Sequence, residues 1–277
     1  MAVQYFQPEI WSARLLSSLK KATVFGSLAT REYEGDIRDS GDTVRITSIS
    51  RPTIGTYTKG STTVTPEQLS DAQRSLLINQ SKYFAFEVDD IDYRQSVSGG
   101  ALLNEAADEA AYGLADAADQ YIAGLYGDIT NTISTVSITS AALAVTGLVN
   151  LKVKLDEANV PNAGRYVVVP PWYHGLLLQS DTFVRVDASG NEMALRNGLV
   201  GRAFGFDVFV SNNCVVITGD DYAVQAGVPG AIAFAEQIVK VEAYRPQDSF
   251  SDALKGRHVY GAKVIRPDAA AVMTASK

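Results

Sequence analysis

The chain has few of the residues on which disulfide-linked proteins, metal proteins and many enzymes depend. Its 277 residues include one cysteine, Cys214, and two histidines, His174 and His258. A single cysteine excludes an internal disulfide, and the two histidines form neither an HExxH motif nor part of a nucleophile elbow. Because valines and a phenylalanine flank Cys214, the sequence predicts a buried apolar side chain there and not a reactive thiol.

The chain also lacks an excess of basic residues and a long apolar run. Its 31 acidic residues outnumber 24 basic ones, which gives a formal net charge of -7. Such a charge disfavours tight binding to nucleic acid, which depends on Lys and Arg side chains that displace phosphate counterions. The longest apolar run, residues 141–151, is interrupted by Thr146, Gly147 and Asn150. We therefore expect no membrane span, no signal peptide and a soluble protein made in the cytoplasm.

The longest regular element that the sequence predicts is a helix over Ala101–Tyr126. Its apolar residues recur at spacings of three and four, the helical period: Leu103, Ala107, Ala110, Leu114, Ala118, Tyr121 and Leu125. Its charged residues are all acidic: Glu105, Asp108, Glu109, Asp116 and Asp119. We expect one apolar face packed on the rest of the protein and one exposed acidic stripe.

An extended arm is predicted ahead of this helix. Alternating residues indicate a strand at 43–47 and another at 83–89, and the stretch between them is rich in Thr, Ser and Gly. A two-stranded arm is marginally stable in water by itself, so an ordered arm needs a neighbour to lean on. Before the arm, Pro8–Ala22 has the pattern of a short amphipathic helix.

The second half of the chain alternates helices and strands irregularly. Ser140 is a suitable N-cap for a helix over Ala141–Asn159, which Pro161 would end. We expect a buried strand over Arg165–Val169 and a short helix over Trp172–Leu178. The remaining features are a glycine-rich turn at Gly198, Gly201 and Gly205, followed by strands at 206–210, 231–235, 238–244 and 257–267. This irregular order indicates an α+β fold and not a doubly wound sheet.

Three phrases of the sequence resemble the major capsid proteins of tailed bacteriophages with the HK97 fold, most closely the P22-type coat proteins. They are RYVVVPPWYHGLLL, GLVGRAFGFDVFVSNN and DSFSDALKGRHVYGAKVIRPDAAAVM. The resemblance implies five parts in chain order: an N-arm over 1–30, an extended loop over 31–89, a peripheral domain with the spine helix over 90–139, an axial α/β domain over 140–235, and peripheral return strands over 236–277.

By this resemblance the chain is a structural protein and not an enzyme, and it needs no cofactor or metal. It would form pentamers and hexamers of an icosahedral shell in the virion, assembled in the host cytoplasm around double-stranded DNA that it contacts non-specifically. Implied partners are a separate scaffolding protein, a portal and a decoration protein, with no membrane. The acidic stripe would face the lumen or a neighbouring subunit. The alternative is an encapsulin-like nanocompartment, which a neighbouring cargo gene would indicate.

The residues expected to make contacts between subunits lie on the arm and just after it. They are Arg51, Tyr57, Lys59, Glu87, Asp89, Asp90 and Asp92. The four acidic residues do not have the spacing of a calcium loop, so pairing with basic side chains or plain solvation is the simpler interpretation.

Two other patterns suggest chemistry and are rejected. Gly55 and Gly60 have the spacing of a phosphate-binding loop, but Ser61 occupies the position of the required lysine. A cross-link of the HK97 type needs an arm lysine and an asparagine on the neighbour's peripheral domain. Lys59 suits the first role, but no asparagine follows Asn213. We therefore expect no covalent cross-linking.

Overall fold

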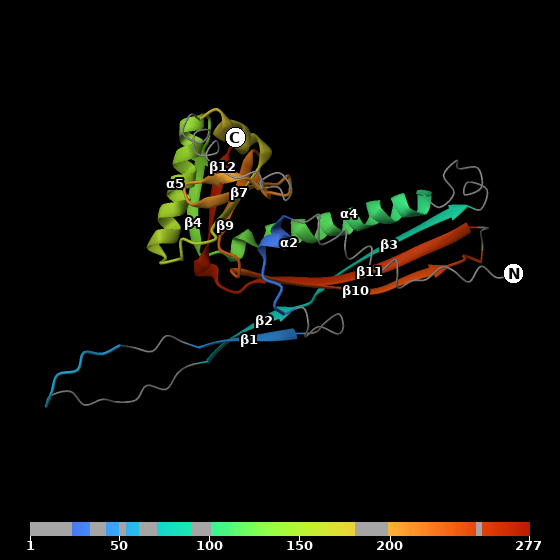
Figure 1. The fold of residues 1–277 in the computed structure, drawn as a ribbon, viewed down its shortest axis with the longest axis horizontal. Coiled ribbons are helices and arrows are strands. Elements are labelled where there is room, and N and C mark those ends of the chain that lie inside the picture. The colour runs from blue at the N-terminus through green and yellow to red at the C-terminus, as the bar shows by residue number, and fades with distance from the viewer. Residues whose placement is uncertain are drawn as a thin grey trace.

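The computed structural model describes seven stretches of the chain, namely 24–33, 43–49, 54–60, 71–89, 101–180, 199–247 and 251–277. The helix expected over Pro8–Ala22 lies outside them. Figure 1 shows a large lobe, a long three-stranded sheet with one helix along it, and a narrow arm that projects away from both.

Helix α4 (Ala101–Ala123) confirms the expected long helix, and a 3₁₀ turn over Gly124–Asp128 continues it. It lies along the three-stranded sheet, which has the order β10-β11-β3 and is antiparallel throughout. These strands are β3 (Gln80–Asp89), β10 (Ile232–Tyr244) and β11 (Ser251–Val264). The small side chains of Ala111 and Ala115 are buried at this contact, where the ring of Phe84 packs against them. Small residues let the helix approach the sheet closely.

Strand β10 is one continuous strand where the sequence pattern predicted two, 231–235 and 238–244. Its register against β11 shifts between Ile238 and Lys240. Before the shift, Phe234 packs in the core with α4 residues, and after it Val241 does. The extra residue of the bulge reverses which residues face the helix, so the alternation breaks although the strand continues.

The large lobe is built on a seven-stranded sheet with the order β4-β12-β9-β5-β7-β6, in which β8 pairs with β9. Its strands are β4 (Asn131–Ser137), β5 (Tyr166–Val169), β6 (Leu199–Ala203), β7 (Phe206–Val210), β8 (Val216–Thr218), β9 (Asp221–Gly227) and β12 (Ala270–Ser276). Helices α5 (Ala141–Glu157) and α6 (Pro171–Leu178) pack against it. The Ser140 hydroxyl accepts a hydrogen bond from the Leu143 N–H at 3.4 Å, which confirms the predicted N-cap.

Five strands of this lobe were not expected from the sequence, and one of them lies where a turn was predicted. Strand β4 is a polar edge strand, β8 is very short, and β9 and β12 contain many alanines, which favour helix over strand. Burial in the sheet overrides that preference. The glycine-rich stretch before 206 is itself strand β6, and the turn is Phe204-Gly205.

The arm is the predicted two-stranded ribbon. Strands β1 (Thr43–Ile49) and β2 (Asp71–Leu77) pair antiparallel, with Thr43 opposite Leu77. At the base of the arm, Leu76 and Ile78 are buried against Ala233, Ala235 and Val259 of the three-stranded sheet. The arm therefore stands on the face of the sheet opposite α4.

The acidic stripe expected on α4 is only partly exposed. Asp108 and Glu109 are exposed, and Asp116 is half-buried. The prediction is wrong for Asp119, which is 2% exposed and accepts hydrogen bonds from other parts of the chain. Cys214 is 4% exposed, as predicted. No helix within the described stretches is long and apolar enough to cross a membrane.

Gly261 allows the arm base to cross β11 at close range, and this generates a testable prediction. A Cβ at this position would collide with the Leu77 carbonyl oxygen and lie 2.9 Å from Cδ1 of Ile78. Because backbone blocks the space, we expect Gly261→Ala to destabilise the chain by about 1–3 kcal/mol in urea unfolding. The control is Gly113→Ala, which meets open space on α4 and gains helix propensity. Equal stability of the two variants would contradict the close approach.

Candidate inter-subunit surface

A hollow lies on the three-stranded sheet, on the face opposite α4 and beyond the arm base. Phe84 packs toward α4, so its neighbours Tyr83 and Ala85 project from the other face. The hollow has a volume of about 480 Å³, and its lining residues are Tyr83, Phe84, Ala85, Glu242, Lys255, Gly256 and Arg257. Below, these seven residues are called the sheet hollow.

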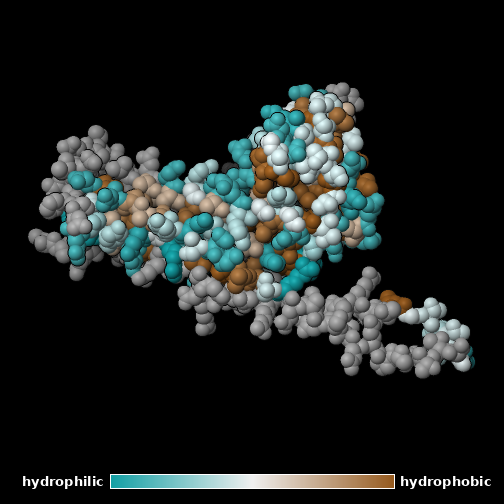
Figure 2. All heavy atoms as spheres, turned by 180° about the vertical axis from the view of Figure 1, so that it is seen from behind, coloured by the Kyte–Doolittle hydropathy of each residue, from teal (hydrophilic) through white to brown (hydrophobic). Residues whose placement is uncertain are grey.

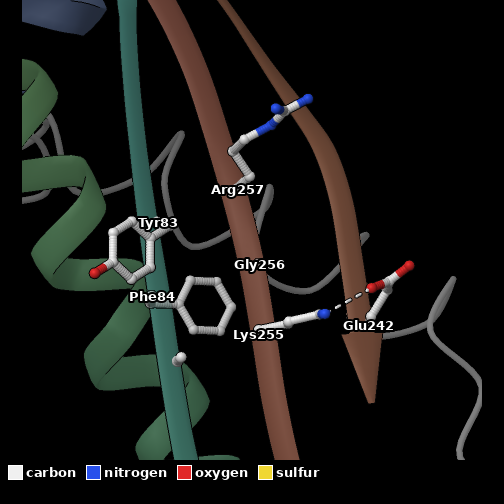
Figure 3. A pocket seen from close by; sticks show the side chains of 7 residues that line it. Tyr83, Phe84, Glu242, Lys255, Gly256 and Arg257 are labelled. Atoms are coloured by element: carbon white, nitrogen blue, oxygen red, sulfur yellow. Dashed lines mark ion pairs between the residues drawn. The ribbon is translucent and has the colours of Figure 1, made fainter. Parts of the chain in front are cut away.

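Charged residues border the sheet hollow without filling it. Figure 3 shows Lys255 reaching from β11 to Glu242 on β10, with Nζ 3.2 Å from Oε2. The same ammonium lies 4.9 Å from the ring centre of Tyr244. Such a half-exposed ion pair contributes little to stability, but it holds the lysine along the strands. Tyr83 is 81% exposed and forms the opposite wall.

The arm tip, residues 54–60, is the second surface. Ile54 is 86% exposed and Tyr57 is 67% exposed. The backbone is irregular to Thr58 and turns at Lys59-Gly60, where Gly60 has φ +82°. Figures 1 and 2 show the tip far from the body of the molecule, and Figure 2 shows hydrophobic colouring among its described residues. Exposed apolar side chains on a projecting arm are typical of a contact with another molecule.

Of the predicted contact residues, two lie on the arm tip, and two lie on β3 outside the sheet hollow. Tyr57 and Lys59 lie on the arm tip. Glu87 and Asp89 lie on β3, exposed on the same face as Tyr83, and the Ser251 hydroxyl donates to Glu87 at 3.2 Å. The other predicted residues, Arg51, Asp90 and Asp92, lie outside the described stretches. Their contacts with other subunits remain predictions.

A buried carboxylate joins three parts of the chain. Helix α2 (Phe25–Leu28) has its first amides on Asp119: the N–H groups of Phe25 and Gly26 donate to Oδ1 at 2.8 and 3.3 Å. The Asn213 amide donates to Asp119 Oδ2 at 3.1 Å and to Asp116 Oδ1 at 2.8 Å. Burial raises the pKa of Asp119, although the donors from Asn213 and the backbone oppose that rise.

A second buried acid anchors the same N-terminal segment, residues 24–33. Arg31 pairs with Glu236, whose other oxygen lies 3.2 Å from Nε2 of the fully buried His258. Burial alone would raise the pKa of Glu236, but His258 and Arg31 outweigh it and hold that pKa below its ordinary value. The Arg31 guanidinium also lies 5.0 Å from the ring centre of Phe234.

These polar anchors were not identified from the sequence. Glu236 stands alone in the apolar run AIAFAEQIV, and a single charge in a buried strand signals a paired partner. The other signals were weaker: Asp119 appeared to continue an exposed acidic stripe, and nothing near Asn213 indicated its partner.

The described residues support binding better than catalysis. Within those stretches, no group of three or more His, Cys, Asp or Glu side chains could hold a metal ion. Burial raises the pKa of the Cys214 thiol to about 12, so the thiol stays protonated and unreactive. His258 is fully buried, with Nε2 at 3.2 Å from Oε2 of Glu236.

The Glu236 site predicts a pH-dependent contribution to stability. Its pKa is lowered from 4.5, so its stabilising effect is complete above that pH and is lost as the pH falls through the lower folded-state pKa. We expect Glu236→Gln to cost about 2 kcal/mol in urea unfolding at pH 7, and less near pH 3.5. Asp252→Asn, an exposed change on β11, is the control. A cost that stays constant with pH would contradict the ion pair.

The comparisons with known proteins agree with a shell protein. The model of the phage capsid protein family matches residues 73–273. A chain in the solved structure of Mycobacterium phage Che8 is 34% identical, with 98% of each chain covered and a TM-score of 0.72. No curated protein matches the chain.

More distant structures share the fold alone. The capsid structure of the cyanophage P-SCSP1u is 18% identical over 93% of this chain and 89% of that one, with a TM-score of 0.68. The virus-like particle from Pyrococcus furiosus is 16% identical over 98% and 100%, with a TM-score of 0.58. The resemblance inferred from the sequence is confirmed: the chain belongs to the phage capsid protein family and is a structural major capsid protein, not an enzyme.

Proposed function

We propose that this capsid protein assembles as pentamers and hexamers into an icosahedral shell, and that the arm of each subunit closes the contact with the next. One observation carries the proposal. The chain exposes apolar side chains at the arm tip and an unfilled sheet hollow, and the two lie far apart in the same subunit. A second copy of the chain brings the two surfaces together.

The chemistry of the two surfaces is complementary. Ile54 and Tyr57 supply apolar area, which the walls of Tyr83 and Ala85 would cover. Lys59 at the tip carries a positive charge, and Glu87, which lies beside the hollow on the same face of β3, carries a negative one. Within the hollow, Lys255 is already paired with Glu242. The face is also already the docking surface of the subunit's own arm base. A neighbour's arm tip would cover the next part of the same face, along strands β3, β11 and β10.

The contents and partners of the shell are inferred from the family to which the chain belongs. We infer that it encloses the double-stranded DNA of a tailed phage, which it contacts non-specifically because a chain of net charge -7 offers little attraction to phosphates. A separate scaffolding protein, a portal and a decoration protein are the proposed partners, with assembly in the host cytoplasm. DNA inside particles purified from infected cells tests this; protein cargo without DNA would indicate a nanocompartment.

The division into domains is also proposed. The N-arm (1–30), the extended loop (31–89), the peripheral domain (90–139) and the axial domain (140–235) follow the order of the chain, and 236–277 returns to the peripheral domain. Strands β4 and β12 pair within the seven-stranded sheet. We therefore move these two strands, which the ranges 90–139 and 236–277 assign to the peripheral domain, to the axial domain of the large lobe.

Shortening the arm tests its role in assembly. We expect deletion within residues 50–70 to leave a folded subunit, because the buried base residues Leu76 and Ile78 stay in place. Closed particles should be absent in electron micrographs, while circular dichroism and the unfolding midpoint stay close to wild type. A matched control replaces the same residues with a Gly-Ser linker of equal length, which should fail in the same way. Normal shells from either variant would show that the arm tip is dispensable.

A pair of introduced cysteines tests which surface the tip meets. The variant carrying both Thr56→Cys and Ala85→Cys places one thiol on the arm tip and one in the sheet hollow. Mild oxidation of assembled particles should give a ladder of covalent oligomers on non-reducing gels, since disulfides form only where Cβ atoms approach to about 4 Å. Each single variant is the control, and the buried Cys214 should not take part. Particles of normal shape without a ladder would place the tip elsewhere.

A further inference from the structure

A polar cavity of about 170 Å³ separates the N-terminal segment from the large lobe. It lies between α4, the start of α2 and the loop that follows β7. Its lining residues are Val24, Tyr112, Asp116, Asp119, Val210, Ser211, Asn212 and Asn213. Asn213 reaches from the loop to the two carboxylates of α4, and its own N–H donates to the Ser211 hydroxyl at 3.1 Å.

Asp119 accepts hydrogen bonds from two separate parts of the chain. One oxygen accepts from the amides of Phe25 and Gly26, and the other accepts from the Asn213 side chain. Docking of the N-terminal segment therefore removes water from the Asp119 carboxylate. The amides of Phe25, Gly26 and Asn213 must replace the hydrogen bonds that water made. Removing any donor makes the docked state less favourable relative to the state in which water solvates Asp119.

The rest of the segment is attached to the three-stranded sheet. The Thr30 N–H donates to the Ile232 carbonyl at 2.9 Å, and Thr30 accepts from the Phe234 N–H at 2.9 Å. Arg31 then pairs with Glu236. The segment thus has two anchors: one on the sheet, and one on a carboxylate that the large lobe helps to solvate.

We propose that Asp119 couples the N-terminal segment to the large lobe, so that withdrawal of Asn213 loosens the hold on Phe25 and Gly26. The stability of the docked segment therefore depends on the position of the loop after β7. This consequence rests on the proposed shell. A contact between subunits that moves this loop would change how firmly the same subunit holds its own N-terminal segment. The coupling passes through Asp119 and needs no hydrogen bond between Asn213 and the segment.

Hydrogen exchange in the full-length Asn213→Ala protein tests the coupling. We expect the amides of Phe25 and Gly26 to exchange about tenfold faster or more, as for loss of a hydrogen bond to a buried charged group. Asn212→Ala, a change in the neighbouring exposed residue, should leave them unchanged. Asp119→Ala gives the largest expected effect. Unaltered exchange across β12 shows that the variant is folded, and Asn213→Ser replaces it if it is not.

Two results would overturn the proposal. One is unchanged exchange at Phe25 and Gly26 in a folded Asn213 variant, and the other is equal acceleration in Asn212→Ala. Either result stands whether or not the chain builds shells, because the exchange can be measured on dissociated subunits. Failure of the coupling is therefore distinguishable from failure of the proposed assembly.

Discussion

The packing of α4 on the three-stranded sheet is the contact on which the other parts of the subunit depend. Alanines at the interface let the helix approach, and Phe84 and Val241 fill the space from the strands. The arm base uses the opposite face of the same sheet, and the N-terminal segment attaches to the end of both layers. The large lobe continues directly from the helix (Figure 1). One two-layer body thus carries the arm, the N-terminal segment and the large lobe.

This arrangement suits a structural subunit better than an enzyme. An enzyme needs a convergent polar pocket, whereas the sheet hollow is mainly apolar and lies on an extended face. The buried polar groups are used internally: Glu236 holds Arg31 and His258, and Asp119 holds α2. Closed assemblies gain stability from many repeated contacts, so each one can be modest. The arm tip and the sheet hollow are small surfaces that would form one such modest contact in every subunit.

Much of the fold could be predicted from the sequence because local patterns and burial agree there. The period of α4, the Ser140 cap and the alternation of β3 each indicate the element that forms. Strand β12 could not be predicted, since its alanines favour a helix and only the sheet makes it extended. The bulge in β10 shifts the alternation of buried and exposed residues by one position, so the sequence pattern suggests two strands where there is one. Asp119 resembled its exposed neighbours, and its partners come from distant parts of the chain.

Electron cryomicroscopy of particles formed by the full-length chain tests the central claim most directly. The account predicts a closed shell of icosahedral symmetry in which the arm tip of each subunit lies on β3 of a neighbour, against Tyr83 and Ala85. A shell in which the tips point into solvent, or a protein that stays monomeric under all conditions of expression, would contradict it.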